Sequence, residues 1–193
     1  MLRSTYDWVM GLAARKDAIW VLAAIAFIES SVFPIPPDVL LIPMVLAARD
    51  RAWRYAAVCT IASVLGGMLG YAIGMFLFES AGQPLLEFYG YADKFDDFRG
   101  RYNEWGAWIV FIAGLTPFPY KVITIASGVA SLDIAVFVAV SVAARGVRFF
   151  VVAWLLYRFG APIQDFIERH LAKLTVLFVV MLFAGFILIK YLF

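Results

Sequence analysis

The sequence predicts an all-α, polytopic membrane protein built from two inverted repeats. Each repeat is expected to hold a re-entrant helical hairpin and a transmembrane helix, with an interfacial amphipathic helix between the repeats and a final C-terminal transmembrane helix. Three observations predict this fold. Of the 193 residues, 64% are hydrophobic and only 16% are charged, whereas soluble domains carry about 25% charged residues. A proline-rich break interrupts two apolar segments, and long apolar stretches follow each break.

The expected organisation is a single membrane domain over residues 1–193. We place repeat one at about 18–79, the interfacial helix at about 84–105, repeat two at about 106–160 and the C-terminal helix at about 172–193. The apolar run of Leu174–Phe193 predicts the last of these elements, and Lys190 within it can reach the membrane surface.

The two breaks repeat one another. Asp38 in the first corresponds to Lys121 in the second, 83 residues later. The arms on either side of the first break hold only about 10 apolar residues each, so each reaches about halfway through a hydrocarbon core that is roughly 30 Å thick. Proline removes a backbone donor and disfavours helix before it. We therefore expect two hairpins with tips near the bilayer midplane, as in transporters with broken helices. The prolines at these tips are Pro34, Pro36, Pro37, Pro117 and Pro119.

Tyr55–Phe78 and Ile134–Tyr157 are apolar enough to form the two spans of the repeats. Gly66, Gly70 and Gly74 recur every four residues on the first, which predicts a face for close helix packing. A hairpin crosses the membrane zero times and a span crosses it once. The second repeat is therefore expected to be inverted, with hairpins that enter from opposite faces and tips that meet.

Aromatic residues recur every three or four positions between the repeats, among many charges, which predicts the interfacial amphipathic helix. They are Phe88, Tyr91, Phe95, Phe98, Tyr102 and Trp105. Basic residues collect on one side of the predicted spans, so the positive-inside rule places the N-terminus in the cytoplasm. They include Arg3, Arg15, Lys16, Arg49, Arg51 and Arg54.

Five ionisable residues fall at predicted membrane depth, where each costs about 2.5–3.5 kcal/mol unless it faces a polar cavity or a partner. We expect them to share one cavity. Three bases suit an anion, and the arginine fork suits phosphate in particular. The two acids could bind substrate or exchange a proton during transport. Alternatively, the charges only pair with each other and join the two halves. The five residues are Glu29, Asp38, Lys121, Arg145 and Arg148.

The segments FIESSVFPIPPDVLL (27–41) and GLTPFPYKVITIASG (114–128) resemble the bacterial DedA family, also called the SNARE-associated or VTT-domain family, and its YqaA-like branch most. The resemblance spans roughly residues 18–169. It implies a multi-pass protein of the bacterial inner membrane that acts as a flippase or scramblase for an anionic lipid, undecaprenyl phosphate or a phospholipid, with suspected proton coupling.

The resemblance also assigns residues. The acids that the family uses near the first hairpin fall on Glu29 and Asp38, and the base of the second hairpin motif falls on Lys121. Arg145 and Arg148 match the R-G-x-R-F-F pattern of the branch. The chain departs from the F-x-P-x-x-R pattern of many members, because it reads Pro-Phe-Pro-Tyr-Lys at 117–121.

Other functions compete with lipid translocation. A proton-coupled exporter of small cations or drugs would use Glu29 and Asp38. An intramembrane enzyme is disfavoured because no catalytic Ser/His pair or H-E-x-x-H motif lies at membrane depth, and a scaffold would leave the buried charges unexplained. One cysteine, Cys59, and one histidine, His170, do not make a metal site. We therefore expect a membrane lipid and protons as partners, with no metal, cofactor or nucleic acid.

Overall fold

The computed structural model describes residues 17–32, 36–116, 119–160 and 162, and the regular elements of this part are all helical. They are α2 (Ala18–Ser31), α3 (Asp38–Ala47), η1 (Arg49–Arg51), α4 (Ala52–Leu77), η2 (Phe78–Gly82), α5 (Gln83–Tyr89), α6 (Ala92–Leu115), α7 (Tyr120–Val129) and a last helix, Ile134–Gly160. The all-α class is confirmed. The helix expected at about 172–193 and the tip residues Pro34 and Pro117 lie outside the described residues.

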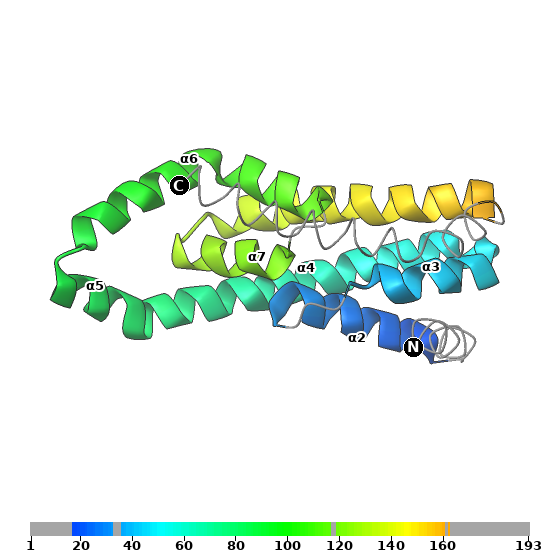
Figure 1. Ribbon diagram of the computed structural model, residues 1–193, viewed down its shortest axis with the longest axis horizontal. Helices are drawn as coiled ribbons and strands as arrows, with labels where there is room; N and C mark the ends of the chain where they lie inside the picture. Colours follow the sequence, from blue (N-terminus) through cyan, green and yellow to red (C-terminus); the bar gives the residue numbers. More distant parts are fainter. Residues whose placement is uncertain (1–16, 33–35, 117–118, 161, 163–193) are drawn as a thin grey trace.

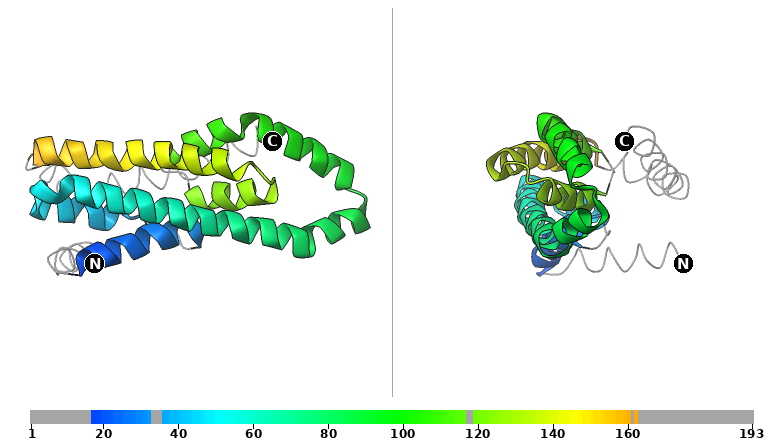
Figure 2. Two further views of the ribbon diagram at one scale, coloured as in Figure 1. Left: turned by 180° about the vertical axis from the view of Figure 1, so that it is seen from behind. Right: turned by 90° about the vertical axis from the view of Figure 1, so that its left-hand side faces the viewer.

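Two helical stretches are long and apolar enough to cross a membrane, namely Arg49–Tyr89 and Ile134–Gly160. They run side by side along the long axis of an elongated bundle (Figure 1, Figure 2). Apolar side chains such as Ile61, Leu65 and Val147 remain exposed along them, which is typical of a surface that faces lipid.

At each proline break one helix ends, and the helix that follows runs back in the opposite direction. Helices α2 and α3 run in opposite directions, as do α6 and α7, and the two pairs enter the bundle from opposite ends (Figure 1). Helix α2 has 14 residues and α3 has 10, so they rise about 21 and 15 Å. Pro37 and Pro119 directly precede α3 and α7, positions that do not require the missing backbone donor.

Helix α4 is the centre of the packing because its glycines let neighbouring backbones approach. A Cβ on Gly66 would collide with the carbonyl of Phe27 on α2, and one on Gly74 would collide with the carbonyl of Ile125 on α7. Gly70 faces both neighbours, since a Cβ there would meet Thr124 and the carbonyl of Ser30. The predicted glycine face is therefore the surface on which α2 and α7 dock.

One predicted boundary is wrong. The segment expected as a separate interfacial helix at about 84–105 is divided between α5 and α6, and α6 continues without a break to Leu115. Gly90, with φ of 68°, closes α5, whereas Gly106 stays helical and packs against Leu132. The helix continues because the residues around Trp105 include no proline and none with a positive φ.

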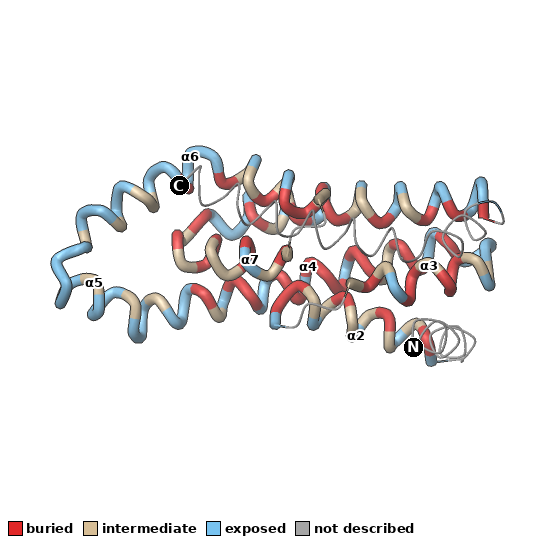
Figure 3. Tube along the Cα trace, in the orientation of Figure 1, coloured by how far each residue is buried: buried red, intermediate tan, exposed pale blue. Residues whose placement is uncertain are grey.

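The aromatic residues of this segment do not lie on one common surface. Phe95 stacks on Phe78 with centroids 4.5 Å apart, and Tyr102 is buried against Ser127 of α7. Phe88 and Trp105 remain exposed. Helix α5 and the first half of α6 project beyond α7 as the exposed end of the bundle (Figure 3).

Candidate functional site

The most buried charge among the described residues is the guanidinium of Arg145, near the middle of the last helix. Its side chain is 1% exposed, and its Nη2 lies 2.5 Å from Oε2 of Glu29, a side chain of α2 that is 13% exposed. Glu29 lies in the last turn of α2, where the helix dipole disfavours a negative charge. The positive charge of Arg145 therefore stabilises the Glu29 carboxylate, which the helix dipole does not.

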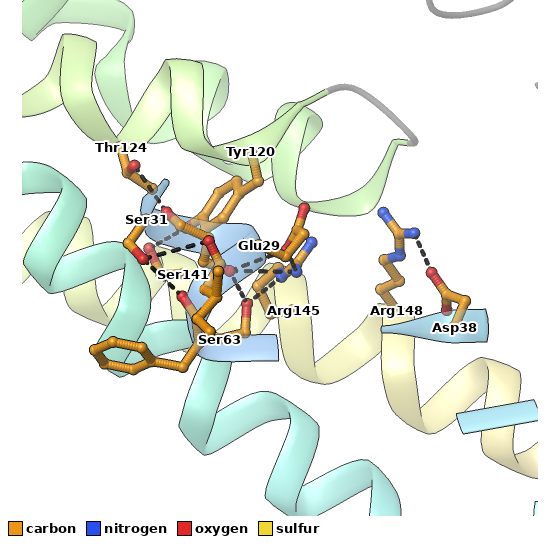
Figure 4. A network of polar contacts seen from close by, with 12 residues as sticks. Glu29, Ser31, Asp38, Ser63, Tyr120, Thr124, Ser141, Arg145 and Arg148 are labelled. Carbon is orange, nitrogen blue, oxygen red and sulfur yellow. Dashed lines mark hydrogen bonds and ion pairs between the residues drawn. The ribbon is translucent and has the colours of Figure 1, made fainter. Parts of the chain in front are cut away.

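Other groups fix Arg145 in place. Nε donates to Oγ of Ser63 on α4 at 2.6 Å, and Nη2 also reaches Oγ of Ser30 at 3.5 Å. The two hydroxyls lie 2.7 Å apart. The guanidinium carbon lies 4.8 Å from the ring centroids of both Tyr120 and Phe149, close enough for cation–π attraction. Figure 4 shows this network, to which α2, α4, α7 and the last helix all contribute.

One nitrogen of this guanidinium lacks a hydrogen-bond acceptor among the described residues. Nη1 of Arg145 is buried and makes no hydrogen bond within the described part of the chain. A buried charged donor without an acceptor costs about 1–3 kcal/mol or more, so native proteins rarely retain one without a role or a bound partner. The guanidinium therefore keeps donor capacity that an acceptor oxygen could use.

Arg148, one turn further along the last helix, makes a second ion pair. Its Nη2 lies 2.6 Å from Oδ2 of Asp38, at the start of α3, where the helix dipole favours a carboxylate. Nη1 donates to the carbonyl of Thr116, the residue that ends α6, at 2.9 Å. One side chain thus connects the end of one broken helix to the start of the other.

Lys121 has a different environment from the one expected. Its Nζ donates to the carbonyl of Val32, the residue that ends α2, at 3.0 Å. Beside it, Thr124 donates to the carbonyl of Ser30 at 3.1 Å. Lys121 makes no ion pair within the described residues, so its visible contact is a helix-end carbonyl rather than an acid.

The structure thus pairs Glu29 with Arg145 and Asp38 with Arg148, whereas Lys121 contacts a helix-end carbonyl. That all five charges share one cavity stays a prediction. Pro36, Pro37 and Pro119 flank the breaks at the starts of α3 and α7. Sequence reasoning did not assign Ser63, Tyr120, Ser141 or Phe149 to the site, although Tyr120 donates to Ser141 at 2.5 Å beside the guanidinium. The available signal was weak: a serine in each of the two predicted spans, and aromatic residues next to charged ones.

These features define an all-α membrane protein with two broken helix pairs and ion pairs buried between them. The particular family follows from comparison, because residues 35–158 match the VTT domain. The chain belongs to the VTT-domain family, also called DedA or SNARE-associated.

Two relatives extend the match over most of the chain. An uncharacterized protein of Haemophilus influenzae is 36% identical over 167 residues, which is 84% of this chain and 86% of that protein. A second uncharacterized protein, from Histophilus somni, is also 36% identical over 167 residues, 84% of this chain and 87% of its own. No solved structure matches this chain.

Proposed function

We propose that this protein moves an anionic lipid across the membrane, as a flippase or scramblase for undecaprenyl phosphate or a phospholipid, with proton coupling through Glu29 and Asp38. The observation that carries the proposal is the guanidinium of Arg145, buried midway along a membrane-length helix with Nη1 unpartnered. Arg148 adds a second guanidinium one turn away.

The chemistry of the site fits a phosphate headgroup. Guanidinium groups donate in their own plane and match phosphate oxygens in pairs. Moving a charged headgroup through hydrocarbon is costly unless polar groups replace its water. Lys121 and the hydroxyl of Thr124 are further donors beside the breaks, each bonded to a carbonyl near the end of α2.

The alternative, export of small cations or drugs, has less support. Each acid that would hold a cation is already paired with an arginine. Among the described residues, the buried side-chain atom of the site that lacks a partner is a donor, Nη1 of Arg145, which a cation cannot use.

The architecture that we propose is two inverted repeats with re-entrant hairpins whose tips meet near the midplane of the bacterial inner membrane. The entry of the two helix pairs from opposite ends of the bundle supports it (Figure 1). The N-terminal side is placed in the cytoplasm, since Arg49, Arg51 and Arg54 lie around the start of α4. Within the family we place the chain in the YqaA-like branch, because Arg145 and Arg148 stand in its R-G-x-R-F-F pattern.

Substitution of Arg145 tests the proposal. Arg145→Ala should slow lipid translocation in reconstituted vesicles roughly 10- to 150-fold, the effect of losing about 1.5–3 kcal/mol from a charged hydrogen bond. Arg145→Lys keeps the charge without the fork, so an intermediate rate is expected. The rate is measured as the accessibility of a labelled polyprenyl phosphate to a membrane-impermeant reagent.

The matched control is Arg101→Ala, which removes an exposed arginine from α6 and should leave the rate unchanged. Each variant is first checked for folding by gel filtration. A wild-type rate in folded Arg145→Ala would remove the function proposed for this site.

A further inference from the structure

The two terminal nitrogens of the Arg145 guanidinium, Nη1 and Nη2, differ in their hydrogen bonds. Nη2 is bound to the carboxylate of Glu29, whereas Nη1 is buried and has no acceptor in the described part of the chain. Nε is turned to Ser63. A phosphate that binds a guanidinium in the bidentate manner needs two adjacent N–H groups. Nη1 is free, but its neighbour on the fork is taken by Glu29.

We propose that Glu29 is an internal competitor for the anion at Arg145, so that proton uptake by Glu29 and anion binding promote each other. The inference rests on the proposed function and states how its binding site is regulated. When Glu29 takes a proton from water, its carboxyl group becomes neutral and its hold on Nη2 weakens. A phosphate oxygen then replaces it, while a second oxygen accepts from Nη1.

Glu29 is better suited to this role than Asp38. It lies in the last turn of α2, where the helix dipole works against its charge, whereas Asp38 lies in the first turn of α3, where the dipole favours it. The Glu29 side chain is 13% exposed, so water can reach it, unlike the guanidinium that it holds.

Within the described residues, no second carboxylate pairs with the same guanidinium. Asp38 is paired with Arg148 instead, and α4 contributes only the hydroxyl of Ser63 to Arg145. The titratable or charged groups that interact with Arg145, the partner of Glu29, are Arg148 on the last helix, Asp38 on α3, Cys59 on α4 and Tyr120 on α7. Lys121 of α7 contacts the end of α2 at the carbonyl of Val32.

The test is the affinity of the purified full-length protein for dioctyl phosphate in a neutral detergent. This diester keeps one negative charge between about pH 5 and pH 9, so the probe itself does not titrate. In the wild type, affinity should fall as pH rises, by up to about tenfold per pH unit wherever one proton is taken up on binding. Glu29→Gln should bind more tightly than the wild type at the upper end of the range, with no pH dependence.

Two controls separate Glu29 from other acids. Asp38→Asn should keep the wild-type pH dependence, because the competitor at Arg145 is intact. Glu104→Gln, the same change at an exposed position of α6, should match the wild type in both affinity and pH dependence. Weaker binding by Glu29→Gln, or a wild-type slope in that variant, would overturn the inference.

A second measurement needs no variant. Calorimetric titration of the wild type in two buffers of different ionisation enthalpy should show about one proton taken up per bound probe, and no uptake would overturn the inference. Arg145→Ala keeps the two proposals distinguishable. If it binds dioctyl phosphate like the wild type, the proposed function fails; if it loses binding but wild-type affinity is independent of pH, only the competition fails.

Discussion

At the scale of single residues, Arg145 and Arg148 make different kinds of contact although they lie one turn apart on the last helix. Arg145 is held by side chains and aromatic rings, whereas Arg148 joins an acid to a helix-end carbonyl. Buried ion pairs stabilise a protein poorly compared with apolar packing. Their presence midway along a membrane-length helix is the feature that the proposed anion binding would account for.

The charges could be predicted as a group from sequence, because an ionisable residue in an apolar segment is conspicuous. Their partners could not, since pairing depends on where α2 and α3 meet the last helix. Lys121 illustrates this. Its place in the second break suggested anion binding, but its ammonium bonds to the carbonyl of Val32, a backbone group that sequence does not distinguish from its neighbours.

Two substitutions separate these roles for Lys121. Gln is uncharged but can still donate to a carbonyl, whereas Met has a similar length and cannot. If Lys121 acts by capping α2, Lys121→Gln should retain most translocation activity. Lys121→Met should lose about 0.5–1.5 kcal/mol of stability, the net contribution of one hydrogen bond, since this bond is exposed and water can replace the donor. Thermal unfolding and the vesicle assay measure the two effects. Equal loss of activity in both variants, with unchanged stability, would instead assign Lys121 to charge-dependent anion binding.

At the scale of elements, the hairpins follow from proline chemistry and could be predicted from sequence. The continuous helix α6 could not. Its charged first half and apolar second half suggested two elements, but polarity does not end a helix, and the segment around Trp105 lacks a proline or a positive-φ residue. Gly90 does have a positive φ, and the chain turns there.

The glycines of α4 allow a direct test of element packing. Gly66→Ala and Gly74→Ala should each destabilise the protein by about 1–3 kcal/mol, because the added methyl group meets a backbone carbonyl that cannot move aside easily. The free energy of unfolding in detergent measures the change.

Gly100 provides the matched control within a helix. A Cβ there meets nothing within 4 Å, so Gly100→Ala should be neutral or stabilising by up to about 1 kcal/mol. Loss of stability in Gly100→Ala equal to that in Gly66→Ala would show that contact with α2 is not the cause.

At the scale of the whole molecule, the two helix pairs enter from opposite ends of the bundle (Figure 2). Sequence reasoning reached this arrangement by parity alone, because each repeat contains an odd number of crossings. Sequence could not predict how far α5 and the start of α6 project beyond the bundle. The projection arises because the helical stretch Arg49–Tyr89 continues past the apolar segment that predicted a span.

The proposed orientation predicts which side of the membrane each end faces. In a Cys59→Ala background, a cysteine at Asp50 should react with an impermeant thiol reagent only from the cytoplasmic side, and a cysteine at Glu87 only from the opposite side. Both positions are exposed and lie at opposite ends of the 41-residue helical stretch that contains α4. Labelling of both from the same side would contradict the proposed orientation.

The central claim is that the buried arginines select an anionic headgroup, and the most direct test compares substrates in the wild-type protein. Vesicles containing the protein would carry either a labelled polyprenyl phosphate or the polyprenol of the same chain length, and protein-free vesicles would give the background rate. If the arginines bind the headgroup, the protein should accelerate movement of the phosphate at least about tenfold more than that of the alcohol, as expected when about 1.4 kcal/mol or more comes from the headgroup charge. Equal acceleration of the two lipids would contradict the account.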